Sequence, residues 1–151
     1  MKKRQGFTLI ELLIVIVIIA ILAGIIYVAV DPATRFKQAR NAERWSSVNS
    51  ILNAYLKYAV DNDGDDPANP NLVGSTKYMI GSGSDYADCG TTAVTNLSNL
   101  VSKYIAEIPV DPKVSGASQT KTYYYILKDT NGRITVGACA AELGVDIKVT
   151  R

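Results

Sequence analysis

Residues 6–13 read Gly6-Phe7-Thr8-Leu9-Ile10-Glu11-Leu12-Leu13, and they open a long apolar run. Glu11 is the only charged residue among the 24 residues from 7 to 30, and residues 12–30 supply 19 positions without a charge. A helix of about 20 apolar residues crosses a bilayer. A carboxylate inside such a segment costs about 3 kcal/mol on insertion scales, so Glu11 requires a partner.

A short basic segment precedes the apolar run. Lys2, Lys3 and Arg4 are expected to stay in the cytoplasm by the positive-inside bias, which places everything after residue 30 across the membrane. A secretory signal peptide is lost together with its apolar region. Here a cut between Gly6 and Phe7 would keep that region and create a new amine, four residues from Glu11.

The octamer, its basic leader and its apolar continuation resemble the class III leader of type IV pilins and of the pseudopilins of type II secretion. A looser resemblance extends to about Tyr58. It implies that a prepilin peptidase cuts between Gly6 and Phe7 and then methylates the Phe7 amine. It also implies partners: copies of the chain in a helical homopolymer, a platform protein, an assembly ATPase, and the cytoplasmic membrane before assembly.

Glu11 acquires a possible partner in such a filament, namely the Phe7 ammonium of a neighbouring subunit. Two unit charges about 4 Å apart attract by about 4 kcal/mol at an effective dielectric constant near 20, before desolvation is subtracted. Our hypothesis is that this pair fixes one register among helices whose apolar surfaces would otherwise slide.

The expected fold is α+β and pilin-like. Residues 1–6 form the leader, residues 7–30 a transmembrane or filament-core helix, residues 31–60 its amphipathic half, and residues 61–151 the globular head. The amphipathic half is predicted from apolar residues at helical spacing, which are Trp45, Val48, Leu52, Tyr55 and Ala59. This face should pack on a small antiparallel sheet of three or four strands, while the apolar half protrudes.

Two positions interrupt the helical pattern. Asp31 is suited to cap a helix and Pro32 to begin one, so we expect an interruption there, and Gly24 is a second candidate for bending. Basic residues follow, and they are expected on the face away from the apolar stripe: Arg35, Lys37, Arg40 and Arg44. Contact with acidic lipid headgroups or neighbouring subunits and a simple solvated face both remain open for them.

The head contains further predicted elements. Helical spacing of apolar residues predicts a helix over 96–108. Tyrosine- and isoleucine-rich residues 121–128, a turn and residues 133–140 predict a hairpin, and alternation predicts a last strand over 145–149. Residues 69–93 are rich in Gly, Ser and Asn and are expected to form an irregular loop.

Composition excludes several functions. The 151 residues include no histidine, which removes His-based triads and His metal sites, so we expect no enzyme. The formal charge of +2 becomes −1 once the three basic leader residues are removed, so no general nucleic-acid binding is indicated.

Two further sets of residues have specific chemistry. Cys89 and Cys139 are the only cysteines, and in an exported head they favour a disulfide over a nucleophilic thiol that no histidine would activate. Carboxylates in an extracellular loop are possible calcium ligands, and here they are Asp61, Asp63, Asp65 and Asp66. Turn formation explains these aspartates without a metal, and Gly64 is misplaced for an EF-hand.

The leading expectation is a structural subunit of a type IV pilus, held in the cytoplasmic membrane and then assembled into an extracellular filament. The alternative within the family is the major pseudopilin of a type II secretion system, because residues 108–112 (Ile-Pro-Val-Asp-Pro) are similar to a pseudopilin segment. A different class is a membrane-anchored extracytoplasmic binding module that uses a pilin-like anchor.

Overall fold

The computed structural model describes residues 6–68, 70–83, 89–91 and 93–151. The chain divides into two units, Met1–Phe36 and Lys37–Arg151, and each is considered by itself. The basic residues of the leader, Lys2, Lys3 and Arg4, lie outside the described residues.

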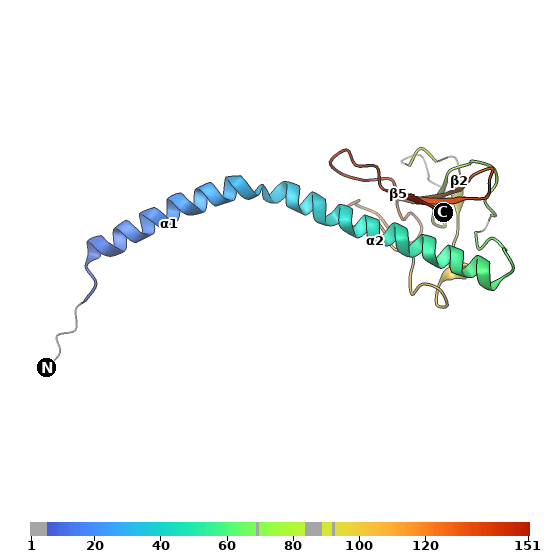
Figure 1. Ribbon diagram of the computed structural model, residues 1–151, viewed down its shortest axis with the longest axis horizontal. Coiled ribbons are helices and arrows are strands. Elements are labelled where there is room, and N and C mark those ends of the chain that lie inside the picture. Colours follow the sequence, from blue (N-terminus) through green and yellow to red (C-terminus); the bar gives the residue numbers. More distant parts are fainter. Residues whose placement is uncertain (1–5, 69, 84–88, 92) are drawn as a thin grey trace. The chain divides into compact units, whose positions relative to one another are not determined.

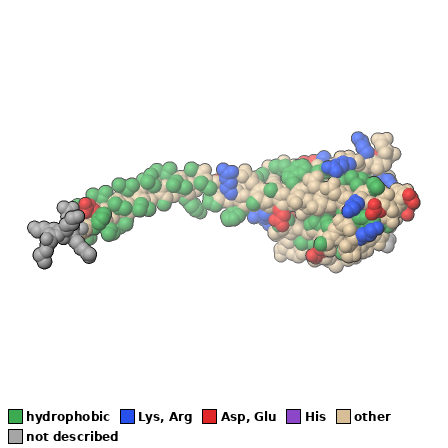
Figure 2. Space-filling model, turned by 60° about the horizontal axis from the view of Figure 1, so that its bottom comes forward, with side chains coloured by type: hydrophobic (Ala, Val, Ile, Leu, Met, Phe, Trp, Pro, Cys, Tyr) green, Lys and Arg blue, Asp and Glu red, His purple; other side chains and the backbone are tan. Residues whose placement is uncertain are grey.

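The first unit is dominated by α1 (Leu9–Val30), a helix of 22 residues in which no side chain is buried. It is apolar on every side, as Figure 2 shows for one face. A helix of this length spans about 33 Å at 1.5 Å per residue, which matches the hydrocarbon thickness of a bilayer. The helix continues through Gly24, and bending there in an assembled state stays a prediction.

Asp31 separates α1 from α2 (Pro32–Asp61), as the sequence predicts. Its backbone is left-handed (φ 42°, ψ 76°), which ends α1. Its side chain accepts hydrogen bonds from the Thr34 N–H and hydroxyl, and thereby caps the start of α2. Pro32 occupies the first helical position, where its missing N–H costs nothing.

The second unit pairs α2 with a mixed sheet (Figure 1). In the described residues the sheet has five strands in the order β2-β1-β3-β4-β5. They are β1 (Tyr78–Ile80), β2 (Ala93–Thr95), β3 (Tyr124–Lys128), β4 (Ile134–Ala138) and β5 (Lys148–Thr150). The predicted hairpin is confirmed as the antiparallel pair β3–β4. A last strand is also present, but β5 begins at Lys148, three residues later than predicted. The α+β, pilin-like class is also confirmed.

Three predictions about the head are wrong. The sheet is not wholly antiparallel, because β1 and β2 are parallel. β1 lies inside the segment expected to be an irregular loop, and β2 begins at the last residue of that segment, Ala93. Part of that segment, residues 69, 84–88 and 92, lies outside the described residues. The helix expected over 96–108 is only the short 3-10 helix η2 (Ser98–Leu100), after which Ser102 has a φ of 74°. Leu97, Leu100 and Ile108 are nevertheless buried, whereas Val101 is 36 % exposed, so the apolar spacing predicted some of the burial but not a helix. The Ser and Asn residues of this segment favour turns.

The core lies between α2 and the sheet. Val48, Ile51 and Leu52 are fully buried, and Tyr124, Ile126 and Val136 cover them from β3 and β4. Burying each such side chain contributes about 1.5–3 kcal/mol.

The buried face of α2 differs from the predicted stripe at one end. Trp45 is 37 % exposed, whereas Arg44 beside it is 0 % exposed. The expectation that Arg44 lies on the outer face is therefore wrong. The reason is that the head supplies Arg44 with carboxylate partners, described below.

Candidate functional site

The predicted cleavage point lies in extended chain just before α1. Gly6, Phe7 and Thr8 have no helical structure, and Phe7 is 84 % exposed. A Cβ added at Gly6 would meet nothing within 4 Å, so the chain itself does not require glycine there. Any requirement for glycine would arise from an enzyme that grips this segment.

Glu11 is held by a capping box at the start of α1. Its Oε2 accepts hydrogen bonds from the Thr8 N–H (2.8 Å) and the Thr8 hydroxyl (2.7 Å), and the Glu11 N–H donates to Thr8 Oγ1 (3.3 Å). These contacts satisfy the carboxylate within its own chain and satisfy helix N–H groups in return. Sequence reasoning assigned Thr8 no role, although the spacing Thr-x-x-Glu is the signature of this cap.

The Glu11–Phe7 ion pair between subunits remains a prediction. While the Gly6–Phe7 bond is intact, the Phe7 nitrogen is a peptide amide and carries no positive charge. In the described residues, α1 is the single helix long and apolar enough to cross a membrane. The segment from Gly6 to Val30 therefore joins an accessible peptide bond, a carboxylate one turn inside a helix, and a membrane-length anchor.

A buried ion pair forms the second notable cluster, inside the head. Arg44 on α2 binds Asp111 in a two-pronged arrangement, with Nε–Oδ2 at 2.7 Å and Nη2–Oδ1 at 3.0 Å. Both side chains are fully buried. Asp111 Oδ1 also accepts the N–H groups of Lys113 (2.9 Å) and Val114 (3.0 Å), so the pair is well satisfied.

Glu142, in the loop between β4 and β5, gathers three cations. Its carboxylate accepts from Arg40 (2.7 and 2.8 Å), from Arg44 Nη1 (3.1 Å) and from Lys113 Nζ (2.8 Å). Lipid or subunit contact and a solvated face were both open for the four basic residues, and two of them, Arg40 and Arg44, bind the head of their own chain. Both alternatives are wrong for Arg44, which is fully buried, while an outside contact stays untested for Arg35, Lys37 and the partly exposed Arg40.

The cations lower the pKa values of both carboxyl groups. Hydrogen bonds from Arg40 and Lys113 hold the pKa of Glu142 well below its ordinary range. Burial alone would raise the pKa of Asp111, but the bonds from Arg44 and from the Lys113 and Val114 N–H groups outweigh it and lower that pKa. The same partner, Asp111, raises the pKa of Arg44, against the opposing effect of burial.

The aspartates proposed for calcium do not converge. In the described part of the chain, no group of three or more acidic or cysteine side chains is placed to hold a metal ion. Asp61 lies 3.8 Å from Lys103, and Asp66 accepts the N–H groups of Ala68 (2.9 Å) and Leu72 (3.1 Å). The calcium set of Asp61, Asp63, Asp65 and Asp66 therefore stays a prediction that this arrangement does not support, and Asp66 is engaged in forming the turn.

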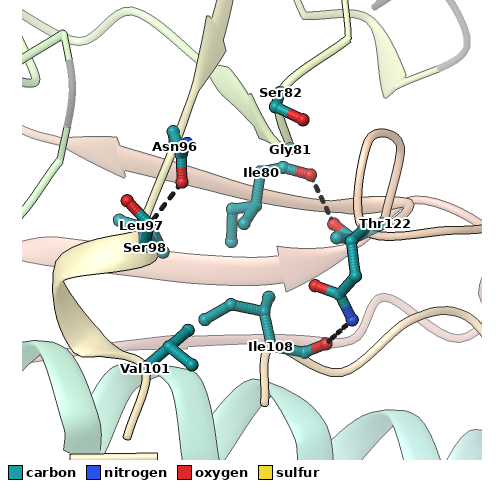
Figure 3. A pocket seen from close by; sticks show the side chains of 10 residues that line it. Ile80, Gly81, Ser82, Asn96, Leu97, Ser98, Val101, Ile108 and Thr122 are labelled. Carbon is teal, nitrogen blue, oxygen red and sulfur yellow. Dashed lines mark hydrogen bonds between the residues drawn. The ribbon is translucent and has the colours of Figure 1, made fainter. Parts of the chain in front are cut away.

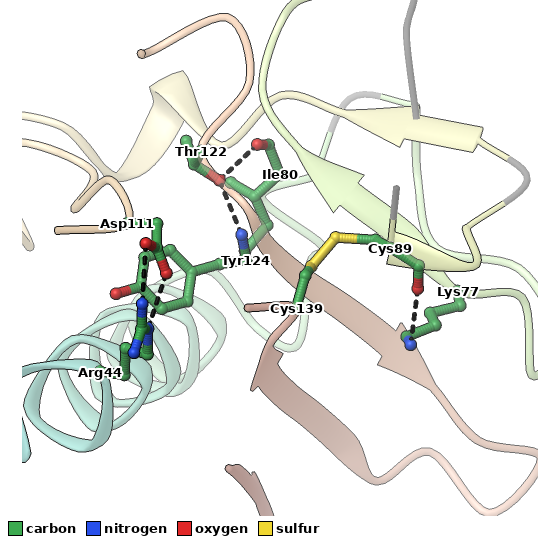
Figure 4. The surroundings of a disulfide bond; sticks show 8 residues. All are labelled: Arg44, Lys77, Ile80, Cys89, Asp111, Thr122, Tyr124 and Cys139. Carbon is green, nitrogen blue, oxygen red and sulfur yellow. Dashed lines mark hydrogen bonds and ion pairs between the residues drawn. A yellow bond between two sulfur atoms is a disulfide. The ribbon is translucent and has the colours of Figure 1, made fainter. Parts of the chain in front are cut away.

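Cys89 and Cys139 are joined in a disulfide, with their Cα atoms 5.1 Å apart at a sequence separation of 50. The bond ties the segment before β2 to the end of β4 (Figure 4). Closing a loop of this length contributes about 4 kcal/mol in the chain-entropy model.

Lys77 adds a second tie beside the disulfide. Its Nζ donates to the Cys89 carbonyl (2.9 Å) and lies 3.8 Å from the centre of the Tyr125 ring. Burial lowers the pKa of this ammonium. On β4, Gly137 pairs with Tyr125, and a Cβ there would lie 2.4 Å from the ring, so the aromatic side chain occupies the space that glycine leaves.

Comparison with known proteins gives one match. Residues 1–27 match the family model described as the prokaryotic N-terminal methylation motif. No curated protein and no solved structure matches the chain.

Proposed function

We propose, from the premise that residues 1–27 carry the class III leader of type IV pilins and pseudopilins, that this chain is the structural subunit of a type IV pilus. That leader implies processing by a prepilin peptidase and entry into a membrane-associated assembly machinery. Our proposal adds cleavage between Gly6 and Phe7, methylation of Phe7, and polymerisation into an extracellular filament.

The proposal rests chiefly on one observation. The Gly6–Phe7 bond lies exposed immediately before a membrane-length helix in which Glu11 is the sole charge. Cleavage releases an ammonium close to that carboxylate, so processing and assembly become chemically linked. The basic residues before Gly6 favour a cytoplasmic leader and an extracytoplasmic head. The chain performs no chemistry in this account, and a cytoplasmic ATPase and a platform protein drive its assembly.

A pilus is favoured over a type II secretion pseudofilament by the head. The family resemblance implies calcium binding in the C-terminal region of a major pseudopilin, and among the described residues none of the acidic groups after Asp129 belongs to a metal-binding cluster. The Cys89–Cys139 disulfide also suits a filament exposed outside the cell.

Electron microscopy of material sheared from cells that make this chain tests the proposal, together with the mass of its N-terminal peptide. We expect long thin filaments whose subunits begin at N-methylated Phe7. A Gly6→Leu variant supplies the matched control, because its blocked cleavage should leave the chain in the membrane with its leader.

Other outcomes would select the alternatives. Short filaments confined to the envelope, with loss of protein export on deletion, would favour the pseudopilin. Processed protein that remains wholly in the membrane would favour an anchored binding module.

A further inference from the structure

The turn at residues 142–145, between β4 and β5, presents an apolar side chain in a strained conformation. Leu143 and Gly144 are both left-handed, with φ of 62° and 68°, and the Val145 N–H points back to the Glu142 carbonyl at 3.4 Å. Glycine adopts this conformation freely, but a branched apolar residue does not. Leu143 is nevertheless 46 % exposed and Val145 is 44 % exposed.

Glu142, the residue before Leu143, is held by contacts to both its backbone and its side chain. The Glu142 N–H donates to Asn41 Oδ1 (3.0 Å), and Asn41 Nδ2 donates to the Glu142 carbonyl (2.7 Å). The Glu142 carboxylate is held by the three cations described above. Strained backbone persists only where its surroundings over-determine it, and such sites concentrate where molecules are recognised. Here a rigid base supports an apolar side chain that the head leaves 46 % exposed.

A half-open cavity of about 190 Å³ lies elsewhere on the head (Figure 3). Apolar side chains contribute much of its lining, from Ile80, Leu97, Val101 and Ile108. An enclosed apolar cavity of about 150 Å³ holds a benzene ring, so this space is large enough for a leucine side chain. Polar side chains, including Asn96 and Gln119, also line it.

The 142–145 turn and the cavity lie at opposite edges of the sheet. The cavity adjoins the ends of β1 and β2, and the turn connects β4 to β5, in a sheet ordered β2-β1-β3-β4-β5. One head cannot bring its own turn into its own cavity across the intervening strands. A second copy can, and its contact would be heterologous.

Charge is also complementary. Gln119, which lines the cavity, donates to the exposed Glu107 carboxylate (2.8 Å) and so places a negative charge beside the opening. The base of the turn gathers three cations, on Arg40, Arg44 and Lys113, against the two carboxylates of Asp111 and Glu142. An excess of positive charge near Leu143 would therefore meet a carboxylate near the cavity.

We infer that Leu143 inserts into the Ile80–Leu97–Val101–Ile108 cavity of a neighbouring copy of this chain. A heterologous contact that does not close a ring generates an open helical assembly, which is the geometry a filament requires. This inference rests on the proposed function, and it assigns the head its own assembly contact in addition to the α1 segment.

Photo-crosslinking tests the contact directly in the full-length chain. A photoreactive amino acid replaces Leu143, cells assemble the protein, and sheared filaments are irradiated and digested. We expect crosslinked dimers in which the residue at 143 is joined to the peptide containing residues 97–108 of the second copy. Crosslinks that map only to other parts of the head would overturn the inference.

Substitution separates assembly from folding. Leu143→Asn tolerates the left-handed backbone and removes the apolar side chain, so we expect an unchanged or higher Tm with at least a tenfold loss of filament yield. The matched control is Val73→Asn, at a valine 61 % exposed elsewhere on the head, which should assemble normally.

The two proposals fail in different ways. Wild-type filament yield from Leu143→Asn would overturn this contact while leaving the pilus subunit intact. A wild-type chain that never forms filaments would overturn the proposed function, and this inference with it.

Discussion

Glu11 in the first unit and Asp111 in the second are satisfied in opposite ways. Glu11 of α1 is held by a residue three positions earlier, through hydrogen bonds that lie on an exposed surface. Asp111 of the head is held by Arg44, which is 67 residues away in sequence, and both side chains are fully buried. Glu11 can exchange its partner, because its contact with Thr8 is exposed and local. Arg44 and Asp111 cannot, because both side chains are buried between α2 and the rest of the head.

This difference suits the two roles we propose. A carboxylate that later pairs with another subunit needs a hydrogen-bond partner in the unassembled chain, and it must be able to leave that partner on assembly. A carboxylate that organises a head should keep one partner throughout. The following experiments test whether the two units differ as described.

The largest effect is expected from Asp111→Ala. Removing one partner of a buried ion pair leaves the other charge uncompensated, so the free energy of unfolding of the head should fall by about 3–5 kcal/mol. Chemical denaturation of the full chain in detergent, followed by tyrosine and tryptophan fluorescence, measures it. The control is Glu107→Ala, which removes an exposed carboxylate and should cost no more than about 0.5 kcal/mol. Equal losses of unfolding free energy from both variants would show that the buried Arg44–Asp111 pair does not stabilise the head more than an exposed carboxylate does.

Reduction of the disulfide should have the next largest effect. Opening the Cys89–Cys139 loop should lower the free energy of unfolding of the head by about 2–4 kcal/mol, because the unfolded chain regains conformational freedom. Unfolding curves with and without a reductant measure the change, and hydrogen exchange of peptides from α1 reports the helicity of that segment separately. Loss of α1 helicity on reduction would contradict the separation into two units.

Two glycine substitutions should have opposite signs. Gly137→Ala places a Cβ 2.4 Å from the Tyr125 ring, and the overpacking should cost the head about 1–3 kcal/mol. Gly24→Ala meets no atom within 4 Å and replaces glycine inside a helix, so it should stabilise α1 by about 1 kcal/mol. Thermal unfolding of the two variants makes the comparison. A neutral Gly137→Ala would mean that Tyr125 moves aside freely.

Acid should affect the head in a defined direction. Asp111 and Glu142 both have pKa values lowered in the folded state, from ordinary values of 3.8 and 4.5. Groups whose pKa is lowered contribute stability above the unfolded pKa, and that stability is lost as the pH falls through the folded pKa. The Tm of the head should therefore hold from pH 7 to pH 5 and fall below about pH 4.5. Glu142→Gln should weaken this dependence, and a Tm that is constant to pH 2 would contradict the assignment.

The comparison also explains what the sequence could reveal. The α1 segment, its interruption at Asp31 and the β3–β4 hairpin depend on neighbours in sequence, and all were predicted. The Thr8–Glu11 cap has an equally local signature that went unused. The burial of Arg44 depends on Asp111 and Glu142, and the parallel pairing of β1 with β2 depends on partners distant in sequence. Helical spacing does place Arg44 on the buried face of α2, four residues before Val48 and seven before Ile51, but it does not reveal the carboxylates that allow a charged residue to be buried there.

The central claim is that the charge of Glu11 serves assembly and not processing. Glu11→Gln tests it most directly, because the amide oxygen can still accept from Thr8 and preserve the cap while the charge is removed. The measurement is the filament yield from cells, alongside the fraction of chains cleaved before Phe7. We predict normal cleavage and at least a tenfold loss of filaments. Normal cleavage with wild-type filament yield would contradict the account.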